Sequence, residues 1–272
     1  MFWTRSSLSA VCALLLLSGC SEYSRVLKSE DKNYKYEKAV EYYKEGECFK
    51  ALPILEELIG LERGTQKAEE VYYYYAQTHY CIGDFYLANY YFKNFTRTYP
   101  NSNYSEECLF LAAMCSYRNS PIYSLEQGET RSAIDDFQLF MDRYPQSTLR
   151  DSCNSMITQL RGKLERKSFE QAKLYYTTLR FKSAVMALQE SLREFPDSRF
   201  REESMFLIVK SQYLLAQNSI EEKKLERYEE TTKFYLTFAA TFPQSTWIRE
   251  AEGYFADSIK QIEKIKGNST LQ

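Results

Sequence analysis

The sequence has few of the residues that catalytic sites require. Its 272 residues include a single histidine, His79, and nine glycines. A Ser/His/Asp triad, a metal cluster or a glycine-rich phosphate loop cannot be assembled from so few. Paired acids such as Glu69-Glu70 predict solvated helix faces, since neighbouring residues on a helix do not face each other. We therefore expect no enzyme activity, no metal and no cofactor, and we expect His79 to be a core residue.

The cysteines lack the spacing of a metal or redox site. No C-x-x-C pair occurs in the sequence, which argues against zinc binding and thioredoxin-like chemistry. Five cysteines lie beyond the N-terminal segment, at Cys48, Cys81, Cys108, Cys115 and Cys153. Because five is odd, at least one thiol stays unpaired. We expect buried free thiols that pack as small hydrophobes, with a structural disulfide as the alternative.

A large excess of charge of either sign is also absent. The formal net charge is −2, and it becomes −3 without the N-terminal segment, whose only charged side chain is Arg5. The basic footprint of a nucleic-acid-binding protein is therefore missing. With 44% apolar and 26% charged residues, the chain has the composition of a globular protein rather than a disordered one.

Aromatic residues, by contrast, are abundant. The chain contains 24 tyrosines and 17 phenylalanines. Aromatic surface forms many peptide grooves and partner interfaces. Packing between helices is the alternative use of these rings, and we expect it to account for most of them.

The N-terminal segment predicts export and lipidation. Arg5 precedes an apolar run, Leu8 to Leu17, that is too short to span a bilayer comfortably, and a small-residue cleavage site follows at 18–20. The ending resembles the lipobox of bacterial lipoproteins, in which Cys20 is lipidated and becomes the first mature residue. An ordinary secretory signal is the alternative. No aspartate follows Cys20 directly, and by resemblance to the enterobacterial sorting rule this favours the outer membrane.

Four of the six prolines share one context: an aromatic residue, proline, a polar residue and serine. Pro100, Pro145, Pro196 and Pro243 are 45, 51 and 47 residues apart. Proline ends a helix because it lacks a backbone donor and clashes with the preceding turn. The serine is placed to accept hydrogen bonds from the N–H groups that begin the next helix. A helical repeat of this length is typical of a solenoid.

The stretch 76–102 shows one repeat in detail. Small residues at Ala76 and Ala88 allow two helices to approach closely, and large residues such as Phe92 fill the space between them. A turn at Gly83 separates the two helices. We expect an all-α fold: a right-handed solenoid of about five helix pairs with a C-terminal capping helix.

Two features depart from regular repeats. A long connection, 119–128, separates the helices of the third pair, and the apolar positions after Ser147 predict one helix of about 30 residues. We expect the following segments: a signal peptide at 1–19, a lipidated cysteine and polar tether at 20–33, N-terminal repeats 1–3 at 34–145, C-terminal repeats 4–5 with the capping helix at 146–266, and a tail at 267–272.

The spacing of an alanine, an aromatic residue four positions on and a proline twelve positions on is similar to the tetratricopeptide repeat (TPR). The lipobox, five repeats, the insertion in the third and the overlong helix together resemble the BamD family, lipoproteins of the outer-membrane β-barrel assembly machinery. The resemblance implies a periplasm-facing scaffold. Its first repeats would face unfolded outer-membrane barrel substrates, and its later repeats would hold the periplasmic domains of a BamA-type barrel insertase. Auxiliary lipoproteins are possible further partners. The alternative is an adaptor of another envelope system, serving peptidoglycan synthesis or Tol-Pal.

In a right-handed stack the leading helix of each pair lines the concave face. Residues that flank the packing positions Ala39 and Ala76 then form the candidate substrate-binding site, in which Lys44 would meet a peptide carboxylate: Tyr36, Tyr43, Lys44, Tyr73, Tyr74, Gln77 and Tyr80. Packing of these tyrosines on neighbouring repeats is the alternative. Candidate partner-binding residues flank the last turns, where a solvated rim is the alternative: Arg199, Arg201, Trp247 and Arg249.

Overall fold

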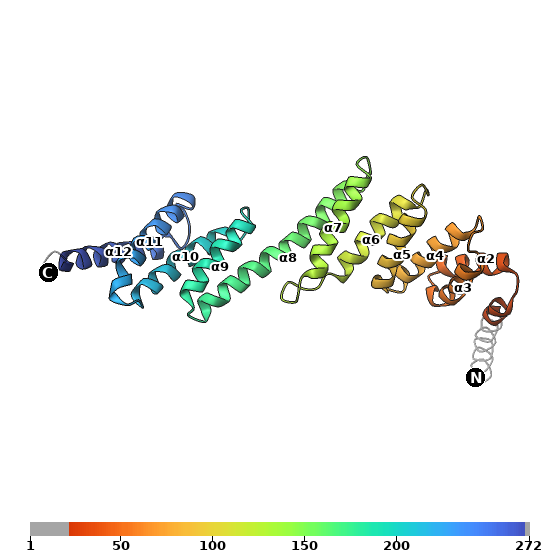
Figure 1. Ribbon diagram of the computed structural model, residues 1–272, viewed down its shortest axis with the longest axis horizontal. Helices are drawn as coiled ribbons and strands as arrows, with labels where there is room; N and C mark the ends of the chain where they lie inside the picture. Colours follow the sequence, from red (N-terminus) through yellow and green to blue (C-terminus); the bar gives the residue numbers. More distant parts are fainter. Residues whose placement is uncertain (1–21, 270–272) are drawn as a thin grey trace, which may run out of the picture. The chain divides into compact units, whose positions relative to one another are not determined.

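A computed structural model describes residues 22–269, and within this range every regular element is a helix (Figure 1). Residues 22–28 are helical. They are followed by α2 (Lys32–Lys44), α3 (Cys48–Leu61), α4 (Ala68–Cys81), α5 (Phe85–Thr98), α6 (Ser105–Asn119), α7 (Gly128–Arg143), α8 (Arg150–Thr177), α9 (Phe181–Glu194), α10 (Arg201–Gln217), α11 (Glu221–Thr241) and α12 (Ile248–Ser269). The expected all-α fold is confirmed: α2 to α11 form five consecutive helix pairs of the TPR type, and α12 follows as the capping helix.

The chain divides into two compact units. The first comprises residues up to 121 together with Glu126–Leu160, and the second comprises Ile122–Leu125 and Arg161 onwards. The division falls inside α8, whose 28 residues confirm the predicted overlong helix. The 122–125 segment of the long connection belongs to the second unit because it packs on α8. There the Arg166 guanidinium lies 4.0 Å from the centre of the Tyr123 ring.

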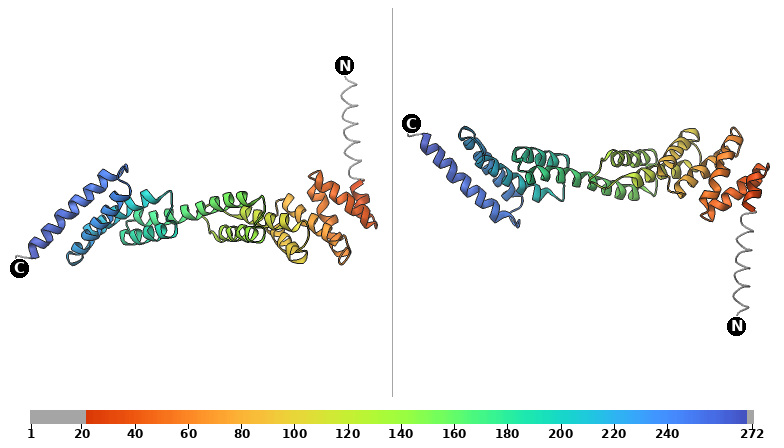
Figure 2. Two further views of the ribbon diagram at one scale, coloured as in Figure 1. Left: turned by 90° about the horizontal axis from the view of Figure 1, so that it is seen from above. Right: turned by 90° about the horizontal axis from the view of Figure 1, so that it is seen from below.

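Each unit is built by stacking helices in chain order (Figure 2). In the first unit, three successive clusters of buried residues are centred on Leu55, Phe92 and Phe137. The second unit has one cluster, which includes Leu188, Val209 and Phe238. Each cluster joins residues of adjacent helix pairs, so the apolar face of one pair is buried by the next, as in other repeat proteins.

The proline turns have nearly the same geometry at all four positions. The residue before each proline ends its helix with φ between −130° and −123° and ψ between 62° and 74°. The serine side chain then accepts a hydrogen bond from the N–H two residues later, over 3.0–3.1 Å, at Ser102, Ser147, Ser198 and Ser245. Each serine thus lies three residues before the next helix and bonds within the turn, so the predicted capping of the first helical N–H groups was wrong: α6 and α10 begin without a side-chain cap.

The predicted polar tether differs from the structure. Residues 22–28 form a helix that packs directly on the first helix pair. Val26 is fully buried, the Glu22 carboxylate lies 2.9 Å from the Lys38 ammonium, and the Tyr23 ring packs edge-to-face on Tyr42. The segment has too few apolar residues for a visible periodicity, but α2 and α3 supply the surface that buries its single valine. The tether prediction was therefore wrong for residues 22–28.

The expectation of free thiols was right for three cysteines and wrong for two. Cys108, Cys115 and Cys153 are buried and unpaired, whereas Cys48 and Cys81 form a disulfide. The disulfide joins the start of α3 to the end of α4 across a sequence separation of 33 residues. These two positions become neighbours only when the first and second helix pairs stack, which explains why sequence spacing did not reveal the bond.

Replacing both disulfide cysteines, as Cys48→Ala with Cys81→Ala, is expected to lower the free energy of unfolding of the first unit by about 3–4 kcal/mol, because closing a loop of this length restricts the unfolded chain. Urea unfolding followed by circular dichroism measures the change. Reductant should lower the urea midpoint of the wild type and leave that of the variant unchanged. Equal midpoints for the two oxidised proteins would contradict a stabilising role.

Three turns, each joining the two helices of one pair, have the same backbone hydrogen bonds. Two of them have glycine at the position with positive φ, and the third has leucine there. Gly46 and Gly83 have φ of 78° and 82°, which glycine adopts without steric penalty. At the corresponding position after α8, Leu179 has φ of 60° and a 73% exposed side chain. Side chains other than glycine are strained in this left-handed region by about 1–2 kcal/mol.

Leu179→Gly is therefore expected to stabilise the second unit by about 0.5–1 kcal/mol, since relief of strain exceeds the added flexibility of the unfolded chain. Trp247, which packs in the core of this unit, reports the urea midpoint by fluorescence. The reverse substitution, Gly83→Leu, serves as the matched control. It should destabilise the first unit through the backbone alone, because a Cβ at Gly83 meets no atom within 4 Å. A lower midpoint for Leu179→Gly would refute the strain argument.

Candidate peptide-binding site

Five tyrosines, each in or directly before the leading helix of a pair, meet on one face of the first unit. We call this set the tyrosine cluster: Tyr36 and Tyr43 of α2, Tyr73 and Tyr74 of α4, and Tyr104 next to α6. Tyr74 is central, with ring-centre distances of 6.2 Å to Tyr36, 5.5 Å to Tyr43 and 5.2 Å to Tyr73. Tyr73 stacks on Tyr104 at 4.2 Å. All five rings are partly exposed, so each one packs on a neighbour and also presents area to solvent.

Hydrogen bonds tie the hydroxyl ends of the cluster to the next repeat. The Tyr36 hydroxyl donates to the Glu70 carboxylate over 2.9 Å, and the Tyr73 hydroxyl donates to Glu107 over 3.0 Å. Gln77 of α4 is buried beside Tyr73. Its amide NH₂ donates to the Tyr73 hydroxyl and to Glu107, and its carbonyl oxygen accepts from Tyr43. Three of these contacts join residues 34 positions apart, which is one repeat length.

Burial and the two carboxylates keep the tyrosine hydroxyls protonated. Desolvation raises the pKa of Tyr36 and of Tyr73 far above the usual value, and Glu70 and Glu107 add to the rise. Desolvation also raises the pKa of Tyr43 and of Tyr74. The raised pKa values favour the protonated hydroxyls, which can donate hydrogen bonds. The cluster presents neutral aromatic surface beside the acidic side chains of Glu70 and Glu107.

Five of the predicted substrate-binding residues come together in the cluster and its hydrogen bonds, whereas no ring contact or hydrogen bond to the cluster involves Lys44 or Tyr80 among the described contacts. Lys44 is exposed at the end of α2, directly after Tyr43. Tyr80 packs instead within its own helix pair, with its ring centre 5.4 Å from that of Phe85 and 6.3 Å from that of Phe92. It lies in the last turn of α4, where the chain bends into α5 and brings the two phenylalanines against it.

Sequence reasoning missed four residues of the site. Tyr104, Glu70 and Glu107 complete the cluster and its hydrogen bonds, and the Lys67 ammonium lies 5.2 Å from the centre of the Tyr36 ring. The 34-residue spacing contained the signal, since it relates Tyr36 to Glu70 and Tyr73 to Glu107. Only the stacked structure tells which residue pairs at this spacing touch.

The predicted partner-binding residues all belong to the second unit. Arg199 lies with its guanidinium 4.8 Å from the Phe200 ring centre, Arg201 donates to the Pro196 carbonyl, and Arg249 is exposed. Trp247 is half-buried and stacks on Phe206 at 5.4 Å, so its ring packs against the core of this unit rather than standing out as an exposed anchor.

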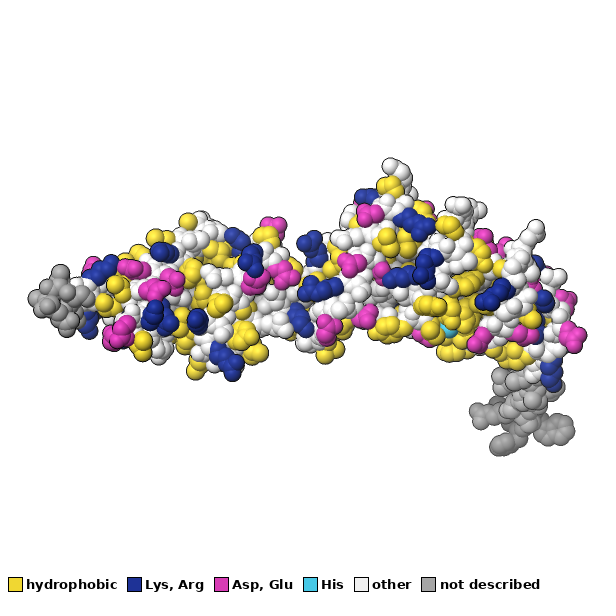
Figure 3. All heavy atoms as spheres, viewed as in Figure 1, with side chains coloured by type: hydrophobic (Ala, Val, Ile, Leu, Met, Phe, Trp, Pro, Cys, Tyr) yellow, Lys and Arg dark blue, Asp and Glu magenta, His cyan; other side chains and the backbone are white. Residues whose placement is uncertain are grey.

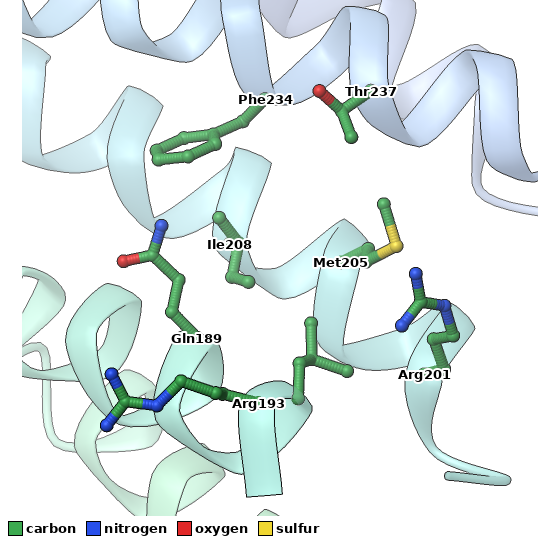
Figure 4. Close-up of a pocket in the computed structure, with 8 residues that line it drawn as sticks. Gln189, Arg193, Arg201, Met205, Ile208, Phe234 and Thr237 are labelled. Atoms are coloured by element: carbon green, nitrogen blue, oxygen red, sulfur yellow. The ribbon is translucent and has the colours of Figure 1, made fainter. Parts of the chain in front are cut away.

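Arg201 also borders a pocket of about 360 Å³ between α9, α10 and α11 (Figure 4). Its apolar surface comes from Leu192, Met205, Ile208 and Phe234, and Arg193 lies across the opening from Arg201. Arg193 is exposed and Arg201 is half-buried; arginines at the edge of an apolar pocket are typical of protein interfaces. Sequence reasoning identified Arg201 but not the pocket, because the pocket is formed only where three helices meet.

His79 occupies the predicted core position. It is 4% exposed and contacts the rings of Tyr75 and Tyr91 at 4.7 and 5.1 Å. Burial lowers its pKa, which favours the neutral imidazole. Hydrophobic side chains gather around the histidine over α4 and α5 (Figure 3), and the exposed aromatic residues of α5 include Tyr86 and Tyr90.

Among residues 22–269, no helix has the length and apolarity needed to cross a bilayer.

The fold and this face define a TPR-type protein with an aromatic surface on its leading helices. The model of the family described as YfiO, outer membrane lipoprotein, matches residues 28–228. The chain therefore belongs to the YfiO family of outer membrane lipoproteins.

Two known proteins resemble this chain, one in sequence and one in structure. The outer membrane protein assembly factor BamD of Vibrio cholerae serotype O1 is 23% identical over 214 residues, which cover 73% of this chain and 87% of the relative. The solved TPR2AB-domain:pHSP90 complex of yeast Sti1 matches with a TM-score of 0.40 and 12% identity, over 84% of this chain and 98% of that chain.

The bond between Gln77 and Glu107 is expected to couple the two repeats. In a double-mutant cycle, Gln77→Ala and Glu107→Ala should show a coupling energy of about 1–2 kcal/mol in urea unfolding, because the amide donates to a charged acceptor. A matched cycle with Glu106→Ala should show coupling near zero, since Gln77 bonds to Glu107 and not to its neighbour. Equal coupling in both cycles would contradict the network.

Proposed function

We propose that this protein is a non-catalytic scaffold of the outer-membrane β-barrel assembly machinery. In this proposal Cys20, which lies outside the described residues, carries the lipid anchor and holds the protein on the periplasmic face of the outer membrane. The scaffold binds unfolded outer-membrane barrel proteins and the periplasmic domains of a BamA-type insertase. Membership of an outer membrane lipoprotein family and similarity to a protein named as an assembly factor support this role.

The tyrosine cluster is the observation that carries the substrate-binding part of the proposal. Aromatic rings that are partly exposed and held in place by neighbours supply contact area at little entropic cost. Tyr36 and Tyr43 are two turns apart on α2, about 10 Å by helix geometry. A short extended segment of a substrate can span this distance. We therefore assign the cluster to binding of the aromatic-rich ends of unfolded barrel strands.

The charges around the cluster suggest how a peptide is oriented. Glu70 and Glu107 lie at the hydroxyl ends of the tyrosines, where they would repel a peptide carboxylate and favour its N–H groups. Lys67 lies beside Tyr36, and Lys44 follows Tyr43. In the proposed mode the aromatic side chain of the peptide packs on the rings, and its terminal carboxylate is directed to one of these two lysines.

For the insertase, we propose the second unit, with Arg199, Arg201 and Arg249 as candidate contacts. The pocket beside Arg201 combines an apolar interior with two arginines, so it suits an apolar side chain flanked by an acidic residue. Trp247 is not an exposed anchor, because its ring packs on Phe206.

A peptide-binding experiment tests the substrate site. Tyr36→Ala with Tyr74→Ala is expected to weaken binding of a ten-residue peptide ending in an aromatic residue by about tenfold or more, since each removed ring is worth about 0.5–1.5 kcal/mol beyond its area. Fluorescence anisotropy of the labelled peptide measures the affinity. Tyr86→Ala, an exposed tyrosine on α5, is the matched control and should bind as the wild type does. Unchanged affinity in the double variant, with an unchanged circular dichroism spectrum, would remove the assignment.

Depletion in cells separates this role from that of an adaptor for another envelope system. Loss of an assembly factor lowers the levels of many outer-membrane barrels together, whereas loss of an adaptor leaves them intact. A pull-down from detergent-solubilised envelope, with Arg199→Glu and Arg201→Glu in parallel, then tests the insertase contact.

A further inference from the structure

The distance between Cys20 and the folded chain is short. Glu22 is already part of the helix 22–28, and its carboxylate is ion-paired with Lys38 of α2. Two residues of extended chain span at most about 7 Å. A lipid on Cys20 therefore holds the first helix pair directly at the membrane surface, with no long tether to separate them.

The surface beside this attachment point has the chemistry of a phosphate-binding site. A hollow is lined by Ser24, Arg25, Lys28, Ser29 and Tyr34. Its lining thus provides two cationic side chains and three hydroxyl groups, and it includes no carboxylate. Arg25 and Lys28 are both exposed. Basic side chains with nearby hydroxyl donors are suited to phosphate oxygens.

An exposed aromatic residue lies at the start of α3. Phe49, in the first turn of α3, is 77% exposed, the largest exposed fraction among the large hydrophobic side chains of residues 22–269. The next residue, Lys50, packs over the Tyr42 ring, which also contacts Tyr23 of the helix 22–28. The start of α3 and the helix 22–28 thus lie on the same part of the first helix pair.

We propose that this face of the first helix pair, formed by the helix 22–28 and the start of α3, docks on the phospholipid surface of the membrane. Arg25 and Lys28 bind headgroup phosphates, and Phe49 enters the interface between headgroups and acyl chains. The docking fixes how the anchored protein is turned relative to the membrane. The inference rests on the proposed lipid anchor at Cys20.

A membrane fits this face better than a protein partner for two reasons. The helix 22–28 begins two residues after the proposed lipid site at Cys20, so the bilayer would be within reach of the hollow. The charged side chains that line the hollow, Arg25 and Lys28, are both positive, which complements anionic headgroups. Acyl chains on Cys20 supply the affinity, so the two basic residues and Phe49 need only orient the protein.

Chemical attachment to lipid allows a test that does not depend on modification in cells. In the mature chain, residues 20–272, Cys20 is the reactive thiol: Cys48 and Cys81 are paired, and burial raises the pKa of Cys115 to about 12 and of Cys153 to about 11, while Cys108 is likewise buried with a raised pKa. Coupling Cys20 to a maleimide lipid places the protein on vesicles of phosphatidylglycerol with phosphatidylethanolamine, or of phosphatidylcholine alone.

In Phe49→Trp, tryptophan emission above the Trp247 background reports docking. We expect a blue shift and quenching by brominated lipid on the anionic vesicles. Adding Arg25→Gln with Lys28→Gln should reduce the ratio of docked to undocked protein by about fivefold for each basic residue. Leu139→Trp, an exposed position on α7 in the third helix pair of the first unit, is the matched control and should stay unquenched.

Absence of quenching at position 49 on anionic vesicles would overturn the proposal, and so would quenching that is unaffected by the two glutamine substitutions. Failure of the proposed lipid anchor is detected separately, as absence of radiolabelled palmitate on the protein in cells. Each hypothesis can thus fail while the other stands.

Discussion

Each helix pair of this protein carries an apolar face that only the next pair can cover. The buried clusters of the first unit follow one another along the chain, and each one combines residues from two adjacent pairs. Because burial is satisfied between neighbours, the faces of the leading and second helices are left free for other molecules. The proline turns maintain this arrangement, since each ends one pair and begins the next with the same backbone geometry.

The first helix pair has a neighbour on one side only, which makes it the weak end of such a stack. Two features compensate for this. The helix 22–28 covers its outer side and buries Val26, and the Cys48–Cys81 disulfide ties it to the second pair. At the other end of the chain α12 packs on α10 and α11. A lipid at Cys20 would therefore attach to a reinforced pair, so a force or an orientation imposed at the membrane would be transmitted to folded structure.

The tyrosine cluster shows that rings which pack between repeats can still present part of their area to solvent. The hydroxyls of Tyr36 and Tyr73 bond to Glu70 and Glu107 of the following repeat, while the rings remain partly exposed. These bonds hold the rings in place, and a ring already held loses little freedom when it binds a ligand. The two alternatives that the sequence left open, packing and binding, therefore do not exclude each other at these positions.

The sequence by itself determined the features that local chemistry controls. Prolines in a shared context predicted the turns at Pro100, Pro145, Pro196 and Pro243, and apolar periodicity predicted the five pairs, the long α8 and the burial of His79. Only the tertiary structure decided the rest: the helix at 22–28, the Cys48–Cys81 bond, the inward packing of Trp247 and Tyr80, and the choice of Glu70 and Glu107 as tyrosine partners. The physical reason is that a turn or a helix depends on residues close in the chain, whereas these contacts join residues of different helices and form only when the helices stack.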